Sequence, residues 1–301
     1  MTKITEILKN HISASNFGPA THGAYERYLK SYIAPFFGDA ECSQLDQKMV
    51  RSFADRLVEN NLSPTTAKGI LSFLKKGLAG HYPPGVFEVG LKSAPRAEIS
   101  VLSRDEQRAL ETAARRSDRT TRICVFMCLY TGIRIGELCG LTFDDVSFAK
   151  REFHVRRTVQ RVMNTDAKSP SKTVVALLPV DEHSNRRIPL PGFLLDMLGE
   201  HRGVAMGSHV ISMGGGVAEP RGLQYRFKKL LLEANIKQAS FQILRHTFAL
   251  RALENGFDVT ALSKILGHAS PVMTYSRYAT LVGEESLARR SMESLAQAMQ
   301  G

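Results

Sequence analysis

From residue 241 the sequence runs Phe241-Gln242-Ile243-Leu244-Arg245-His246-Thr247-Phe248, and the helical spacing of apolar residues continues through Leu253. Arg245 stands among apolar residues. A buried arginine is costly unless it faces a carboxylate or another anion. The segment therefore predicts an arginine that binds an anion from an interior helix.

A second arginine stands earlier in the chain, in Thr131-Gly132-Ile133-Arg134-Ile135-Gly136-Glu137-Leu138. Gly132 permits a sharp break, so Arg134 can project from the start of a new helix. Glu137 lies one turn further on and can brace the guanidinium. Taken alone, the pair also fits an ordinary surface ion pair, which stabilises a protein only weakly.

A third segment reads Ile265-Leu266-Gly267-His268 and is followed by Met273-Thr274-Tyr275-Ser276-Arg277-Tyr278. A lone histidine after a glycine is more often a helix-end residue than a catalyst. Two tyrosines three positions apart are more often packing residues.

In this order, the three segments closely resemble the tyrosine recombinase (phage integrase) family, whose motifs read T-G-x-R-x-x-E-L, x-x-L-R-H-T and L-G-H followed by a tyrosine. The offsets agree, with 23 residues from Arg245 to His268 and 10 from His268 to Tyr278. The resemblance spans residues 98–282 and includes an L-S-x-x-E opening at 102–106 and a strand like R-x-I-P-L at 186–190.

The resemblance implies a metal-independent, cofactor-free enzyme that breaks and rejoins DNA. Tyr278 would attack a phosphate, form a 3′-phosphotyrosyl link and release a 5′ hydroxyl. Arg134 and Arg245 would hold the non-bridging oxygens, and His268 would donate a further hydrogen bond. The family pattern T-x-x-x-Y fits Thr274 and Tyr278, which leaves Tyr275 at a position that is usually not catalytic.

Two positions depart from the family pattern. Gln242 stands where the family usually has histidine, and glutamine cannot exchange a proton near neutral pH. The family's general-acid lysine is missing from residues 180–187. Lys172 is the nearest candidate if it lies at the hairpin turn. Otherwise it is a solvated lysine at a strand start, and Lys168 and Arg186 are further options.

Charge and composition indicate the partner. The formal net charge is +11, with an excess of +4 in residues 1–97 and +7 in residues 98–301. Because both halves are basic, a polyanion that contacts both is expected, and double-stranded DNA at specific sites is the candidate. Surface charge that only solubilises the protein is the alternative. Plausible phosphate contacts are Lys68, Lys75 and Lys76.

The expected compartment is the cytoplasm, with no membrane partner. No uninterrupted apolar run of about 18–20 residues is present, as a membrane span would require. The first residues lack a secretory apolar core. Cys124 and Cys128 are spaced as buried helical residues, and the absence of C-x-x-C and H-E-x-x-H argues against a metal site.

The expected fold is mainly α with a small β-sheet in the C-terminal domain. Residues 1–90 would form a helical, SAM-like core-binding domain with helices at 3–13, 19–37, 45–60 and from Ser63-Pro64. Residues 91–101 would be a linker. Residues 102–301 would be the catalytic domain, with strands at 152–159, 173–178 and 187–191 and a tail helix at 284–300. By resemblance, the two domains form a C-shaped DNA clamp, and four protomers assemble on two sites.

Two alternatives stay open. Residues 258–268 also fit a helix–turn–helix loosely, which would suit a regulator that binds DNA without cutting it. The departures at Gln242 and the missing lysine would also suit a relative whose chemistry is weakened.

Overall fold

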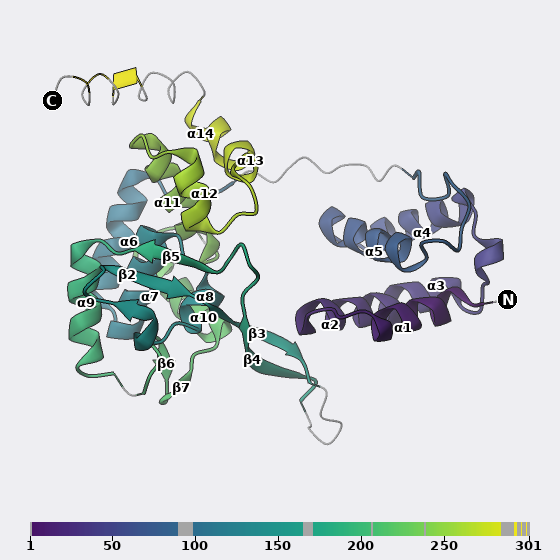
Figure 1. The fold of residues 1–301 in the computed structure, drawn as a ribbon, viewed down its shortest axis with the longest axis horizontal. Coiled ribbons are helices and arrows are strands. Elements are labelled where there is room, and N and C mark those ends of the chain that lie inside the picture. Colours follow the sequence, from purple (N-terminus) through teal and green to yellow (C-terminus); the bar gives the residue numbers. More distant parts are fainter. Residues whose placement is uncertain are drawn as a thin grey trace. The chain divides into compact units, whose positions relative to one another are not determined.

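The computed structural model describes residues 2–89, 99–164, 171–205, 207–237 and 239–283, together with residues 292, 293, 296 and 299. The chain forms two compact units, one of residues 1–98 with 161–174 and one of residues 99–160 with 175–301. Helices build the first unit, and the second adds small antiparallel sheets (Figure 1). The expected mainly helical class with a small sheet is therefore confirmed.

The first unit is a set of packed amphipathic helices. Polar caps start two of them, because the side chains of Asp46 and Ser63 accept from the backbone N–H three residues on. Their apolar faces meet in one core, while Lys68, Lys75 and Lys76 are exposed. The elements are α1 (Ile4–Ala14), α2 (Pro19–Tyr28), a π-helical turn (Leu29–Ile33), α3 (Ala34–Phe37), α4 (Gln47–Glu59) and α5 (Pro64–Gly77).

The centre of the second unit is α7 (Arg119–Thr131), which is buried on almost every side. It packs against α6 (Arg104–Arg116), α8 (Ile135–Cys139) and three later helices. A capping box of Ser103 and Glu106, within the L-S-x-x-E opening, starts α6. Cys124 and Cys128 are buried, as their spacing predicts.

The small sheet has the order β1 (Val146–Ser147), β2 (Glu152–Val155) and β5 (Arg186–Pro189). Antiparallel register pairs Val155 with Arg186 and Phe153 with Ile188. Because side chains alternate along a strand, Arg186 and Ile188 face inward while Arg187 faces solvent. The strand expected at 152–159 is interrupted at Arg156, and β3 (Arg157–Met163) then pairs with β4 (Thr173–Pro179).

The remaining helices complete the second unit around α7. They are α9 (Gly192–Arg202), α10 (Pro220–Glu233), α11 (Gln242–Glu254), α12 (Val259–Leu266), α13 (Pro271–Thr274) and α14 (Thr280–Val282), with β6 (Ser212–Met213) and β7 (Gly216–Val217) between α9 and α10. A π-helical turn (Tyr275–Ala279) joins α13 to α14. The predicted tail helix at 284–300 falls, except for four residues, outside the described residues. In the described ranges, no helix has the length and apolarity to cross a membrane.

Candidate active site

A left-handed glycine aims the first arginine. Gly132 ends α7 with φ +65°, and a Cβ there would lie 2.6 Å from Cδ1 of Phe248. The break makes Arg134 the N-cap of α8. Its backbone N–H donates to Glu137 Oε2 at 3.0 Å, and its guanidinium donates to Oε1 at 2.6 Å. The contact predicted between Arg134 and Glu137 is present.

Glu137 is shared between two arginines. Arg186 enters from the inward face of β5 and donates to both oxygens of Glu137, at 3.2 and 2.9 Å. Only 3% of the Glu137 side chain is exposed. Burial alone would raise the pKa of this carboxyl. The hydrogen bond from Arg186 and the charges of Arg186 and Arg134 outweigh burial and hold the pKa below its usual value.

Arg245 is the most deeply placed cation, with 2% of the residue exposed. Its guanidinium donates to the carbonyl oxygens of Gly132 and Leu266, at 2.6 and 2.5 Å. Burial and the charge of Arg134 lower its pKa. Within the described ranges no carboxylate forms an ion pair with Arg245, and the groups in hydrogen-bond contact with it are uncharged.

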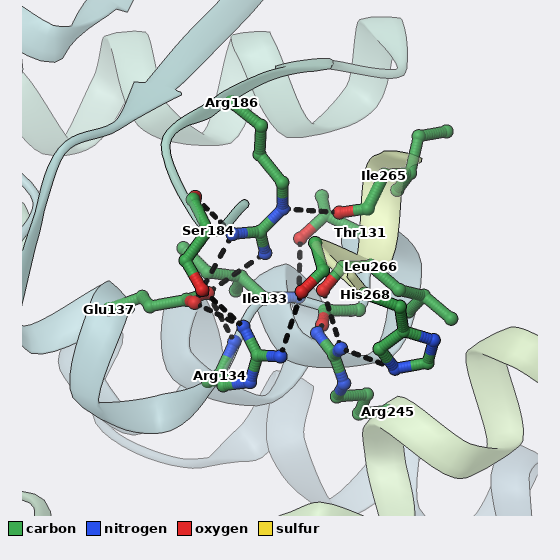
Figure 2. Close-up of polar contacts among 12 residues, drawn as sticks. Thr131, Ile133, Arg134, Glu137, Ser184, Arg186, Arg245, Ile265, Leu266 and His268 are labelled. Atoms are coloured by element: carbon green, nitrogen blue, oxygen red, sulfur yellow. Dashed lines mark hydrogen bonds and ion pairs between the residues drawn. The ribbon is translucent and has the colours of Figure 1, made fainter. Parts of the chain in front are cut away.

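The C-terminal end of α12 binds all three arginines. Consecutive carbonyls of Ile265, Leu266 and Gly267 accept from Arg186, Arg245 and Arg134, at 2.5, 2.5 and 3.2 Å (Figure 2). The last carbonyls of a helix lack partners within it and carry the negative end of its dipole. One helix end therefore fixes the positions of three cations.

His268 completes the cluster as a neutral imidazole. Its Nε2 lies 3.2 Å from the Arg245 guanidinium, which can only donate, so Nε2 accepts. The proton is therefore on Nδ1, which donates to the Thr274 hydroxyl at 2.7 Å. Burial, Arg245 and Arg134 lower the pKa of His268 to about 4.

Tyr278 is fully buried and contacts a residue of α11, the helix that carries Arg245. Its ring packs among Ala249, Leu253 and Leu266, and its hydroxyl lies 2.7 Å from His246 Nδ1. Burial raises the pKa of the Tyr278 phenol, although Arg245 opposes the shift. His246 was not predicted as a site residue, because in the x-x-L-R-H-T motif it simply follows the arginine.

Three other candidate residues are exposed. Gln242 is exposed at the first position of α11, and 44% of Tyr275 is exposed. Lys172 is exposed beside the β3–β4 turn, and its carbonyl accepts from the Asn164 N–H. It belongs to the segment grouped with the first unit. Lys168 lies outside the described residues.

Arg186 is engaged as a brace, which does not suit a general acid. Its Nε donates to Ile265, and its two terminal nitrogens donate to Glu137 and the Ser184 carbonyl. A guanidinium held in this way orients its neighbours. Only its period-two position on a predicted strand could have indicated that Arg186 faces inward.

The charges of the cluster do not balance. Arg134 and Arg186 share one carboxylate, Glu137, and Arg245 pairs with none among the described residues, so the local excess is positive. Such a site is completed by an anion with several acceptor oxygens. In the part of the chain that the structure describes, no group of three or more His, Cys, Asp or Glu is placed to hold a metal ion.

The model of the phage integrase family matches residues 100–284, which include every residue of this cluster. The chain belongs to the phage integrase family. The residues that the motifs predicted, Arg134, Arg245, His268 and Tyr278, lie within the matched range. The family consists of tyrosine-type site-specific recombinases.

Curated relatives extend the similarity beyond the residues that the family model matches. A tyrosine recombinase XerC-like protein of Caldanaerobacter subterraneus subsp. tengcongensis is 25% identical and aligns with 89% of this chain and 75% of its own. The tyrosine recombinase XerA of Thermococcus onnurineus is 27% identical, covering 90% of this chain and 88% of its own.

Solved integrase structures share the fold. The Tn1549 transposon integrase in complex with transposon right end DNA has a TM-score of 0.81 at 20% identity, covering 98% of this chain and 100% of that one. A lambda integrase dimer bound to a COC′ core site has a TM-score of 0.65 at 17% identity, covering 90% and 97%.

Proposed function

We propose that this phage integrase family member is a site-specific DNA recombinase that cuts and rejoins strands through a 3′-phosphotyrosyl link to Tyr278. The observation that carries the proposal is the unbalanced arginine cluster. Arg245 is buried without an ion pair among the described residues, Arg134 binds the neighbouring carbonyl at the end of α12, and the buried Tyr278 contacts α11, the helix of Arg245. A phosphodiester supplies the missing anionic oxygens.

The chemistry follows from the geometry. Arg134 and Arg245 hold the two non-bridging oxygens and stabilise the negative charge that grows on them during displacement. A bound phosphate is a nearby anion, so it raises the pKa of His268. His268 then carries a proton on each ring nitrogen, and its Nε2–H donates a hydrogen bond to the same oxygens. The phosphotyrosyl bond preserves the energy needed for rejoining.

The leaving 5′ oxygen requires a proton, and Lys172 is our proposed donor. It is exposed and directly precedes β4, and its carbonyl accepts from the Asn164 N–H of the paired strand's end. A lysine ammonium near a phosphate can transfer a proton to an alkoxide. Cleavage by Lys172→Ala at the wild-type rate would show that another group is the acid.

The nucleophile is tested by two matched tyrosine variants. On a nicked suicide substrate, Tyr278→Phe should form no covalent protein–DNA adduct, because phenylalanine lacks the attacking oxygen. Tyr275→Phe should form it, because that ring lies outside the buried cluster. The adduct is measured as a band that survives denaturing electrophoresis. An adduct in Tyr278→Phe, or none in the wild type, contradicts the proposal and favours a regulator that only binds DNA.

Both units should contact DNA as a C-shaped clamp, with Lys68, Lys75 and Lys76 of α5 on phosphates. Replacing all three by alanine should reduce the slope of log Kd against log salt by up to about 2.7, or about 0.9 per lost phosphate contact. Lys9, Lys30 and Lys48 give a control of equal charge, since they are exposed on other helices of the same unit. Equal salt slopes for the two triple variants would show that these lysines of α5 do not contact DNA phosphates.

We further propose that four protomers act together on two DNA sites. The support is a solved lambda integrase tetramer bound to a Holliday junction, which covers 92% of this chain with a TM-score of 0.66. Light scattering of the complex on paired sites gives the protomer number, and two protomers in an active complex would contradict the proposal.

A further inference from the structure

The hydroxyl that is proposed to attack DNA already has a hydrogen-bond partner. His246 Nδ1 lies 2.7 Å from the oxygen of Tyr278, whose ring belongs to a small core with Ala249, Leu253, Leu262 and Leu266. His246 directly follows Arg245 on α11. The phosphate-binding guanidinium and the imidazole that meets the phenol are therefore neighbours on one rigid helix, with Cα atoms about 3.8 Å apart.

The direction of this hydrogen bond follows from the chemistry of the two groups. Burial, Arg277 and Arg245 lower the pKa of His246 to about 4, so the ring is neutral and has one nitrogen lone pair. Burial keeps the Tyr278 phenol protonated. Because a phenol is a much stronger acid than a neutral imidazole N–H, its O–H donates to Nδ1, and the ring proton is on Nε2.

Gln242 stands at the position where the family usually has a histidine that could accept the phenolic proton. It stands on the same helix, four residues before His246, and its side chain is exposed. Glutamine can form hydrogen bonds but cannot accept a proton near neutral pH. Within the described residues, His246 is the titratable group in hydrogen-bond contact with the Tyr278 oxygen.

We propose that His246 is the general base that accepts the phenolic proton of Tyr278 when its oxygen attacks the DNA phosphorus. This inference rests on the proposed function. As the new oxygen–phosphorus bond forms, the bond from phosphorus to the 5′ oxygen breaks. The phenolic proton moves to His246 Nδ1, and the 5′ oxygen takes a proton from Lys172. Rejoining reverses both transfers.

Single-turnover cleavage of a nicked suicide substrate tests the role. His246→Asn keeps a hydrogen-bonding amide near the place of Nδ1 but cannot accept a proton, and His246→Ala removes both properties. Both variants should cleave about 100-fold or more slowly than the wild type, within the usual contribution of a general base. Their DNA affinity should be unchanged, which a gel-shift titration measures. Wild-type cleavage by His246→Asn would show that the residue only positions the phenol and would overturn the proposal.

A sulfur substrate separates the two ends of the reaction. With a 5′-bridging phosphorothiolate, the thiolate leaves without a proton, so a defect in the general acid is relieved. Lys172→Ala should recover on this substrate, whereas His246→Asn should remain slow because its phenol still has to lose a proton. Recovery of His246→Asn would place His246 on the leaving-group side and contradict its assignment as the base.

A measurement on the unaltered protein needs neither DNA nor a variant. Nitrogen-15 NMR of labelled histidine distinguishes the two neutral tautomers, and His246 should carry its proton on Nε2. A proton on Nδ1 would make the imidazole the donor and overturn the proposal, whatever the cleavage assays show. An absence of adduct from the wild type, with Nδ1 unprotonated, would instead contradict the proposed function.

Discussion

Glu137 is the only carboxylate that forms ion pairs with the arginine cluster among the residues described. Each of its oxygens accepts from Arg134 and Arg186 together. Arg245 is not paired with it and depends on backbone carbonyls. Glu137 therefore offsets part of the positive charge and leaves the remainder for a ligand. This division of charge explains how one site can be both stable when empty and attractive to phosphate.

Removing the charge of Glu137 should destabilise the folded protein. Glu137→Gln is expected to lower the free energy of unfolding by about 3–5 kcal/mol, because it leaves buried guanidinium charge unpaired. Urea unfolding measures the change. Glu254→Gln is the matched control, since Glu254 accepts from Arg251 and Arg104 outside the cluster and is more exposed. A loss as large in Glu254→Gln as in Glu137→Gln would contradict the special role of Glu137.

Sequence patterns predicted some of these contacts and missed others for a physical reason. The spacing from Arg134 to Glu137 is a helical i,i+3 pair, so one turn of local structure was enough to predict it. The contact between His246 and Tyr278 joins residues 32 positions apart. It depends on how α11 packs against the π-helical turn, and no local pattern encodes that. Motif offsets identified both residues' neighbourhoods but not their contact.

At the level of elements, the end of α12 determines the geometry of the site. Gly267 takes φ +64° after the last turn, and a Cβ there would lie 3.0 Å from Nη1 of Arg186. The left-handed turn lets the chain leave the helix while the carbonyls of residues 265–267 still face the arginines. Glycine is needed here both for its backbone freedom and for the space it leaves.

Gly267→Ala should therefore lose more than backbone freedom. A left-handed alanine costs about 1–2 kcal/mol, and the added methyl should also displace Arg186. Gly214→Ala is the control, because Gly214 has φ +63° and nothing lies within 4 Å of its virtual Cβ. Thermal unfolding should show a loss in both variants, larger in Gly267→Ala, and adduct formation should fall about tenfold only in Gly267→Ala. An equal effect on cleavage would rule out the contact with Arg186 as the cause.

Element boundaries with polar caps were predictable, and irregular turns were not. Ser103 with Glu106 and Ser63 with Pro64 mark helix starts by local chemistry, and the structure has helices there. The π-helical turn Tyr275–Ala279 was not predicted. Such a turn adds one residue to a helix, so the spacing of apolar residues does not predict it. Similarly, the strand expected at 152–159 was one run of alternating residues, and its break at Arg156 depends on which partner strand each half finds.

For the molecule as a whole, pH should act mainly through the second unit. The pKa of His246 and that of His268 are both lowered to about 4 in the folded state, against about 6.5 when unfolded. Between these values the unfolded chain binds more protons, so stability is complete above pH 6.5 and falls as the pH falls to 4. The lowered pKa of Glu137 adds a loss in the same direction below about 4.5.

Urea titrations between pH 4 and 7 measure this dependence. The double variant His246→Asn, His268→Asn should have a shallower slope, by up to two protons per molecule. The variant His22→Asn is the control, since His22 lies in α2 of the first unit. A double variant with the wild-type slope would assign the proton uptake to other groups.

The carbonyls that end α12 also bear on how freely this sequence can vary. They belong to the main chain, so these hydrogen bonds from the arginines do not depend on which side chains stand at residues 265 and 266. Any apolar pair that packs equally well would present the same oxygens. The positions of the three arginines thus depend on the path of the backbone, which includes two left-handed glycines, Gly132 and Gly267. Substitution should therefore be restricted at those two glycines and tolerated at residues 265 and 266, provided that the new side chains pack equally well.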